Sequence, residues 1–164
     1  MRIANRSLGI GMIEVLVTLF VLSVGILAGA AMQMKSLKNT QESLFRSQAV
    51  NLVNTIVESM RANPEAVVLG YYDNISTTNV FNSTGCLTTG CSPENIATED
   101  IIQWQSLLAP ANGSIPVLPP MNNDEPAEAT ISGNTDGVRT VTVHWQVAID
   151  GDVKDKTYSL DVRL

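Results

Sequence analysis

An uncharged apolar stretch near the start of the sequence constrains the fold more than any other feature. From Val15 to Met32 no side chain is charged, and only Thr18 and Ser23 are polar. As a helix with a rise of 1.5 Å per residue, this stretch spans about 27 Å, close to the roughly 30 Å hydrocarbon core of a bilayer. A soluble protein would have to bury such a helix on every face, which the rest of a 164-residue chain can hardly do. The stretch therefore predicts insertion into a membrane.

Three processing outcomes are compatible with this stretch. It is a permanent signal anchor, or it is a Sec signal peptide cut after Ala28-Gly29-Ala30, an A-x-A-like site. In the third outcome, residues 1–9 form a short polar leader with Arg2 and Arg6 that is removed by itself. The apolar helix then stays on the mature protein.

Glu14 favours the third outcome. A carboxylate inside a membrane segment costs on the order of 2.5 kcal/mol or more, so it needs a partner unless it lies near enough to the surface to stay hydrated. Cleavage between Gly9 and Ile10 would create an α-amine four residues before Glu14. That amine could neutralise the carboxylate of its own chain, one helical turn away, or that of a neighbouring chain.

The same residues resemble the leader of a known family. Residues 7–15, Ser-Leu-Gly-Ile-Gly-Met-Ile-Glu-Val, are similar to the class III leader of type IV prepilins and type II secretion pseudopilins. The resemblance implies cleavage after Gly9 and N-methylation of Ile10, both by the prepilin peptidase/N-methyltransferase. It also implies that Glu14 docks the subunit into a filament growing at the inner-membrane assembly platform. Ile10 and Gly11 replace the commoner Phe and Thr or Ser of that family.

A second pattern predicts that the helix continues beyond the apolar part. Apolar residues recur at steps of mostly three and four, which indicates an amphipathic helix over 35–62. Asn63-Pro64 ends it, because the residue before a proline disfavours the α conformation. With the membrane-spanning part, 10–34, the helix would cover 53 residues, or about 80 Å. We expect its second half to pack on a head formed by 63–164. The predicted buried face comprises Leu37, Leu44, Phe45, Ala49, Leu52, Val53, Ile56, Val57 and Met60.

Gly25 and Gly29 form a G-x-x-x-G motif within the apolar part. In lipid this spacing lets two helices approach closely. Glycine also weakens a helix, so local unwinding is an equally valid interpretation.

The first part of the head predicts loops and one helix. Residues 66–123 are rich in Ser, Thr, Asn and Pro, which is typical of loops with short elements. Pro93 and Glu94 favour the start of a helix that follows Ser92 and runs to Leu108. Trp104 is expected to anchor this helix in the core.

The two cysteines predict a disulfide. Cys86 and Cys91 enclose four residues, and His144 is the only histidine, so the ligand set of a zinc site is missing from the sequence. A C-x-x-C redox motif is also missing. Because the head is predicted to be exported, a short-range disulfide that pins a surface loop is the default.

The last third of the chain predicts an antiparallel sheet. Apolar and polar residues alternate over Val141–Ile149 and again over Tyr158–Leu164, with Asp150-Gly151-Asp152 as a hairpin turn between them. Glu128–Ser132 adds a third strand. The expected fold class is therefore α+β, with a long N-terminal helix packed on a small sheet.

Charge and motifs argue against catalysis, metals and nucleic acids. The net charge is −6, and no Lys or Arg occurs between Arg61 and Arg139, whereas a nucleic-acid binder needs a basic face. Asp150, Asp152 and Asp155 lack the ligand spacing of an EF-hand, so a solvated acidic turn is favoured over a calcium loop. The sequence has no Ser/His/Asp set, phosphate-binding glycine loop or paired catalytic carboxylates. We expect neither enzyme activity nor a cofactor.

Three motifs at the end of the helix and in the head resemble the PilV family of minor pilins, the type IV pilus modification proteins. They are residues 60–66 (Met-Arg-Ala-Asn-Pro-Glu-Ala) at the end of the helix, Gly90-Cys91 followed by Asp100 and Trp104-Gln105, and residues 140–145 (Thr-Val-Thr-Val-His-Trp). The resemblance implies a type IV pilin-like fold and a low-abundance subunit that joins other minor pilins and the major pilin. Such a subunit primes pilus assembly, sits at the tip and in some complexes presents a large adhesin. It crosses the inner membrane once before it enters the cell-surface pilus.

Two alternatives remain open at this point. A minor pseudopilin of type II secretion shares the leader motif. A periplasmic binding domain secreted by the Sec route would instead use Ala28-Gly29-Ala30 as its cleavage site.

Overall fold

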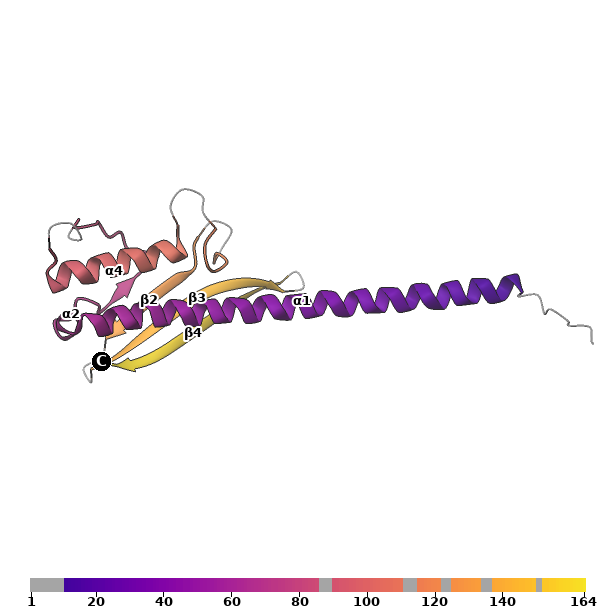
Figure 1. The fold of residues 1–164 in the computed structure, drawn as a ribbon, viewed down its shortest axis with the longest axis horizontal. Coiled ribbons are helices and arrows are strands. Elements are labelled where there is room, and N and C mark those ends of the chain that lie inside the picture. Colours follow the sequence, from indigo (N-terminus) through magenta and orange to yellow (C-terminus); the bar gives the residue numbers. More distant parts are fainter. Residues whose placement is uncertain (1–10, 86–89, 111–114, 122–124, 134–136, 150–151) are drawn as a thin grey trace, which may run out of the picture. The chain divides into compact units, whose positions relative to one another are not determined.

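The computed structural model of the chain describes residues 11–85, 90–110, 115–121, 125–133, 137–149 and 152–164. Two compact units divide the chain, one ending at Gln41 and the other beginning at Glu42. We call the described part of the first, 11–41, the stem segment, and the second, 42–164, the head. In chain order the elements are α1 (Met12–Ala62), α2 (Pro64–Val68), β1 (Ile75–Ser76), α4 (Pro93–Leu108), β2 (Glu128–Gly133), β3 (Val138–Ile149) and β4 (Asp152–Arg163) (Figure 1).

The long predicted helix is present as α1, which runs through both units. Its 51 residues correspond to about 77 Å at 1.5 Å per residue. It ends at Ala62 because Pro64 cannot continue its hydrogen-bonding pattern, and Pro64 instead occupies the first turn of the short helix α2. The side chain of Asn63, between the two helices, donates from Nδ2 to the carbonyl oxygen of Pro93 at 2.8 Å.

A four-stranded antiparallel sheet forms the second layer of the head, in the order β1-β2-β3-β4. The predicted hairpin is confirmed: β3 and β4 pair along their whole length, with Val141 opposite Leu160 and Val143 opposite Tyr158. Glu128–Gly133 supplies the predicted third strand, which places Ala129 opposite Val143. The two-residue strand β1, which the sequence did not predict, pairs with β2 at the edge.

The core of the head lies between the second half of α1, α4 and the apolar face of the sheet. Helix α4 begins after Ser92, whose side chain accepts a hydrogen bond from the backbone N–H of Asn95 at 3.2 Å. Trp104 is 1% exposed and its Nε1 donates to the carbonyl oxygen of Leu52 at 2.9 Å, so its predicted role as a core anchor is confirmed. From α1 the core receives Ala49, Leu52, Val53, Ile56, Val57 and Met60.

Two members of the predicted buried face of α1 are exposed. Leu37 is 62% and Leu44 is 54% exposed, whereas Ala49 and the later members are buried. The head begins only at Glu42, and Phe45 is the first apolar side chain of α1 that packs against its core. Periodicity identifies which face of a helix is apolar, but it does not show where the layer that covers this face ends.

Candidate functional site

The stem segment presents apolar side chains that no other part of the described chain covers. Every residue from Gly11 to Gln41 is exposed. By length and composition α1 is apolar enough to cross a membrane. Exposed apolar surface of this extent is unfavourable in water at about 25 cal/mol per Å². The segment therefore requires an apolar environment from outside this chain, and its large exposed side chains include Leu16, Leu19, Phe20, Leu22, Ile26 and Leu27.

The two hydroxyl groups within the apolar stretch 15–32 are hydrogen-bonded inside the helix. Thr18 Oγ1 donates to the carbonyl oxygen of Val15 at 2.9 Å, and Ser23 Oγ donates to that of Phe20 at 2.7 Å. Both hydroxyls are thus bonded without a second chain or water, which suits a helix in lipid or in a packed filament.

Glu14 lies in the first turn of α1, where its side chain is exposed. Its backbone N–H donates to the carbonyl oxygen of Gly11 at 2.9 Å, so the helix is already formed at this residue. A carboxylate at this end of a helix interacts favourably with the helix dipole. Gly9 and Ile10, the predicted processing residues, lie outside the described residues, so the pairing of Glu14 with an amine at Ile10 stays a prediction.

Gly25 and Gly29 are both part of continuous helix, and a Cβ added at either would meet no atom within 4 Å. The spacing of four residues places them on one side of α1. Close approach of another helix at these glycines stays a prediction, because the structure contains a single chain. Of the two alternatives, local unwinding at Gly25 is not seen here, since α1 continues through it.

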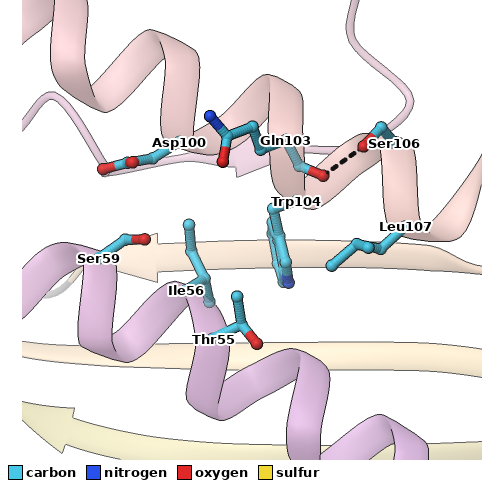
Figure 2. Close-up of a pocket in the computed structure, with 8 residues that line it drawn as sticks. All are labelled: Thr55, Ile56, Ser59, Asp100, Gln103, Trp104, Ser106 and Leu107. Atoms are coloured by element: carbon cyan, nitrogen blue, oxygen red, sulfur yellow. Dashed lines mark hydrogen bonds between the residues drawn. The ribbon is translucent and has the colours of Figure 1, made fainter.

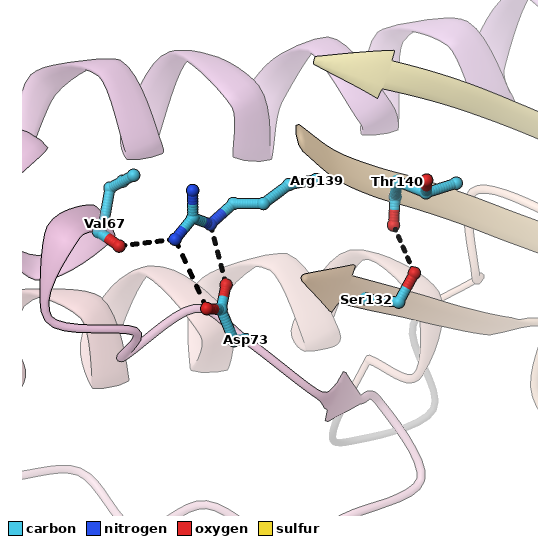
Figure 3. A network of polar contacts seen from close by, with 5 residues as sticks. All are labelled: Val67, Asp73, Ser132, Arg139 and Thr140. Atoms are coloured by element: carbon cyan, nitrogen blue, oxygen red, sulfur yellow. Dashed lines mark hydrogen bonds and ion pairs between the residues drawn. The ribbon is translucent and has the colours of Figure 1, made fainter. Parts of the chain in front are cut away.

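A buried ion pair connects α2, the turn after it and the sheet. Arg139 Nε donates to Asp73 Oδ1 at 2.7 Å, and Arg139 Nη2 donates to the carbonyl oxygen of Val67 at 2.5 Å (Figure 3). Arg139 is 8% exposed. A Cβ at Gly133 would come within 2.7 Å of the Asp73 carboxyl group, so the strand β2 can approach this pair only with glycine there.

Glu99 on α4 fixes the loop that leads toward the cysteines. Its Oε1 accepts hydrogen bonds from the hydroxyl of Ser83 at 2.8 Å, from the backbone N–H of Thr84 at 2.6 Å and from the hydroxyl of Thr84 at 2.9 Å. These donors, Ser83 first, lower the pKa of Glu99 because they stabilise the ionised carboxylate. Glu99 is 7% exposed, so it is a buried charge that is fully engaged in holding this loop.

A cleft of about 250 Å³ lies between the second half of α1 and α4. Figure 2 shows the hydroxyl of Ser59 directed into it and the ring of Trp104 at its floor. Asp100 at its rim accepts a hydrogen bond from Tyr72 Oη at 2.5 Å. Burial raises the pKa of Asp100, and the Tyr72 hydroxyl partly opposes this effect. The other residues that line the cleft contribute hydroxyl, amide and apolar groups. An acid and a base in contact with each other, as general acid–base catalysis needs, are not among these lining residues.

Among the described residues, the side chains form no catalytic or metal-binding set. No group of three or more His, Cys, Asp or Glu side chains there is arranged to hold a metal ion. His144 bonds through Nδ1 to the hydroxyl of Thr157 at 2.9 Å on the polar face of the sheet. Asp155, one of the three aspartates of the calcium alternative, accepts a hydrogen bond from Gln146 Nε2 at 2.7 Å, and Asp150 lies outside the described residues. Cys86 also lies outside them, so its disulfide with Cys91 stays a prediction.

Two of these head contacts were not foreseen from the sequence. The position of Arg139 could have been noticed in the sequence, because Arg139 lies on the same face of its strand as the core residues Val141 and Val143. A charged side chain on that face requires a buried partner. Glu99 had none, since the donors at Ser83 and Thr84 lie about 15 residues earlier in a segment without periodicity.

Comparison with known proteins bears on this arrangement. A family model described as Tt1218-like, Type IV pilin Tt1218, matches residues 31–102. The match supports a relationship of this chain to the type IV pilin superfamily, without pointing to a particular member. It covers the second half of α1, α2, β1 and most of α4. The long apolar N-terminal helix, packed on a small four-stranded antiparallel sheet, is consistent with a type IV pilin fold. No curated protein and no solved structure matches the chain.

Proposed function

We propose that this chain is a minor pilin of the PilV type. In this role it joins other minor pilins, primes assembly of a type IV pilus and becomes part of the pilus at or near its tip, where it supports adhesion and twitching motility. The observation that carries the proposal is the uncovered apolar stem segment, which has Glu14 in its first helical turn and follows a leader-like sequence. The match to a type IV pilin family supports it.

In the proposed maturation, the prepilin peptidase cuts after Gly9 and methylates the new amine of Ile10. The cationic amine then lies four residues before Glu14, within one helical turn. Pairing of this amine with the Glu14 carboxylate of the next subunit reduces the cost of placing either charge in an apolar filament core. It also sets the register between subunits, because only one axial offset brings the two charges together.

Assembly then replaces lipid by protein around the stem segment. In the inner membrane, acyl chains cover its apolar side chains while the head stays in the periplasm. In the pilus, the same side chains pack against the stems of other minor pilins and the major pilin. Gly25 and Gly29 allow a neighbouring helix to approach closely, since a Cβ-sized space is open at both.

The head supplies the specific surface in this proposal. Its chain from 62 to 138 has no lysine or arginine, so the surface formed by α2, α4 and their loops is acidic. A Cys86–Cys91 disulfide and the hydrogen bonds to Glu99 together would hold the loop before α4 in one conformation. A rigid, acidic head is suited to binding other tip subunits or a large adhesin.

Incorporation of a Glu14→Ala chain into pili tests the proposal. We expect this chain to accumulate in the inner membrane and to be strongly depleted from sheared pili, because its docking charge is missing. Glu58→Ala is the matched control, since Glu58 is an exposed head carboxylate whose ion pair within the described part of the chain is with Arg61 on the same helix. Normal incorporation of the Glu14→Ala chain would contradict the docking role.

Deletion of the gene separates the pilus from the secretion machinery. The proposal predicts few or no pili and loss of twitching, with extracellular enzymes still secreted. Normal pili together with a loss of enzyme secretion would assign the chain to a type II secretion pseudopilus and refute the pilus assignment.

A further inference from the structure

A group of exposed apolar side chains lies in the turn where α2 ends. Val68 is 85%, Leu69 is 58% and Tyr71 is 37% exposed. We call these three residues the distal patch. The part of α1 that belongs to the head, 42–62, is about 30 Å long, and α2 follows its far end (Figure 1). The distal patch is therefore remote from the residue at which the stem segment joins the head.

Backbone hydrogen bonds hold this turn in one conformation. The N–H of Leu69 donates to the carbonyl oxygen of Glu65 at 3.0 Å, and the N–H of Tyr71 donates to that of Ala66 at 3.0 Å. Between them Gly70 has a φ of +79°, a conformation that glycine adopts without steric strain. The residues of the distal patch are thus close to one another along an ordered backbone.

The buried ion pair fixes the same turn to the sheet. Arg139 Nη2 donates to the carbonyl oxygen of Val67 at 2.5 Å, and Arg139 Nε donates to Asp73 Oδ1 at 2.7 Å (Figure 3). Val67 and Asp73 stand on the two sides of the distal patch in the sequence. Val67 and Tyr72 are 3% and 0% exposed, so they occupy the inner side of the turn. The distal patch is consequently held on its outer side.

Apolar side chains that are held in water in this way indicate a docking surface. Single exposed apolar residues such as Val80 are ordinary, whereas three of the four residues from 68 to 71 form a cluster. A turn that is already ordered loses little conformational entropy when it binds. The distal patch therefore offers apolar area to a partner at low entropic cost.

The charge around the distal patch identifies the kind of partner. Glu65 on α2 is exposed, and no Lys or Arg occurs from 62 to 138. Two copies of this chain that met through the distal patch would place like charges opposite each other, which disfavours their association. An apolar depression that is bordered by Lys or Arg complements both the patch and its acidic surroundings.

We propose that the distal patch docks into an apolar depression with a basic rim on a neighbouring subunit that differs from this chain. Val68, Leu69 and Tyr71 supply the apolar contact, and Glu65 faces the basic rim. The assignment of that neighbour to a type IV pilus rests on the proposed function. The docking surface itself depends only on the head.

Photo-crosslinking in cells tests the docking surface. The photoreactive amino acid p-benzoyl-phenylalanine is incorporated in place of Leu69 in the full chain, and cells and sheared pili are irradiated. The matched control carries it in place of Val80, which is 87% exposed. Val80 lies outside the patch, since its neighbour Asn79 accepts a hydrogen bond from Gln105 in the second half of α4.

We expect an adduct between the Leu69 position and a different subunit, identified by mass spectrometry of the linked peptides. Its yield should exceed that from the Val80 position several-fold. Equal yields from the two positions, or an adduct between two copies of this chain, would overturn the proposal.

A charge introduced into the distal patch tests whether the contact contributes to assembly. Leu69→Asp should lower the amount of chain recovered in sheared pili several-fold, whereas Val80→Asp and the apolar Leu69→Met should not. All three positions are changed at exposed side chains, so equal melting temperatures of the variants will exclude misfolding as the cause. Recovery of Leu69→Asp at the level of the unaltered chain would contradict the proposal.

The partner in the adduct separates this inference from the proposed function. An adduct with another pilin supports both. An adduct with a type II secretion pseudopilin would support the docking surface and refute the pilus assignment. The lack of any adduct at the Leu69 position, in a chain that is present in pili, would overturn the docking surface and leave the proposed function standing.

Discussion

The two halves of α1 differ in what covers them, although they belong to one helix. In the head, α1 buries its apolar face against α4 and the sheet, and Ala49, Val53 and Met60 are fully buried. In the stem segment, every residue from Gly11 to Gln41 is exposed. Most helices in proteins are stabilised by packing of one face and not by helix propensity alone. The comparison therefore shows that the head carries its own stabilising contacts, whereas the stem segment has none from the rest of the described chain. In the proposed function, lipid and other subunits supply them.

The polar groups differ in the same way. In the stem segment the hydroxyls of Thr18 and Ser23 bond to carbonyls of their own helix. In the head the charged groups bond across elements, as in the contact of Arg139 with Asp73. Glu14 is the charged group of the apolar part of the stem segment, and its predicted partner is the amine of the mature N-terminus.

Truncating the central tryptophan should produce the largest contrast between the two regions. Trp104→Ala removes a buried ring and should destabilise the head by about 3–5 kcal/mol. Phe20→Ala, at an exposed position of the stem segment, should change head stability by less than about 0.5 kcal/mol. Denaturant unfolding of the full chain in micelles, followed by near-UV circular dichroism, measures both. Equal losses would mean that the two regions do not fold independently.

Breaking the buried ion pair should have the next largest effect. Arg139→Ala leaves Asp73 with an uncompensated charge and frees the carbonyl of Val67, so we expect a loss of about 3 kcal/mol in head stability. The double variant Arg139→Ala with Asp73→Ala should recover part of this loss, because no lone charge remains. A double variant as unstable as the sum of the single variants would show that the two side chains do not interact.

The pH dependence of head stability should contain a contribution from Glu99. Its pKa in the folded head is lowered from the ordinary value of 4.5. A carboxyl group with a lowered pKa stabilises the fold above its unfolded pKa, and this contribution disappears as the pH falls through the folded pKa. We therefore expect Glu99→Gln to be less stable than the unaltered chain at pH 7. The difference should shrink steadily below about pH 4.3. Thermal unfolding of both chains across this range measures it, and a constant difference would contradict the assignment.

Asp100 should show the smallest effect, with the opposite sign. Burial raises its pKa, so the folded head binds this proton more tightly than the unfolded chain does. The group therefore disfavours folding when it is ionised at neutral pH, and stability increases as the pH falls through the raised pKa. Asp100→Asn keeps an acceptor for Tyr72 and removes the charge. It should slightly raise the melting temperature at pH 7 and have no such effect at low pH. A lower melting temperature at pH 7 would contradict this sign.

The sequence was sufficient for the elements with strong periodicity. The apolar run and the three- and four-residue steps predict α1, Ser92-Pro93 marks the start of α4, and alternation predicts the central part of β3. The first half of β4, from Asp152 to Thr157, lacks such alternation, and it is a strand because it pairs with β3 residue by residue. The two-residue strand β1 also depends on pairing, in this case with Ile131 and Thr130 of β2. Pairing between distant segments leaves little trace in a local pattern.

The residues of the candidate site also fall into those that a local pattern reveals and those that only the fold brings together. Glu14, Gly25 and Gly29 were evident because their types stand out in an apolar helix, whatever the rest of the chain does. The contacts of Glu99 with Ser83 and Thr84 and of Lys156 with Glu42 join residues that only the folded head brings together. Lys156 and Glu42 are 114 positions apart, and no local signal relates them.

The mass of the mature N-terminus tests the central claim most directly, namely that the stem segment is kept on the mature chain for assembly with other subunits. The chain is recovered from membranes and sheared pili, and its N-terminal peptide is analysed by mass spectrometry. The account predicts a chain that lacks residues 1–9 and begins with N-methylated Ile10, so that Glu14 and the whole apolar segment remain. A mature chain that begins at Ala31 would have lost that segment and would contradict the account.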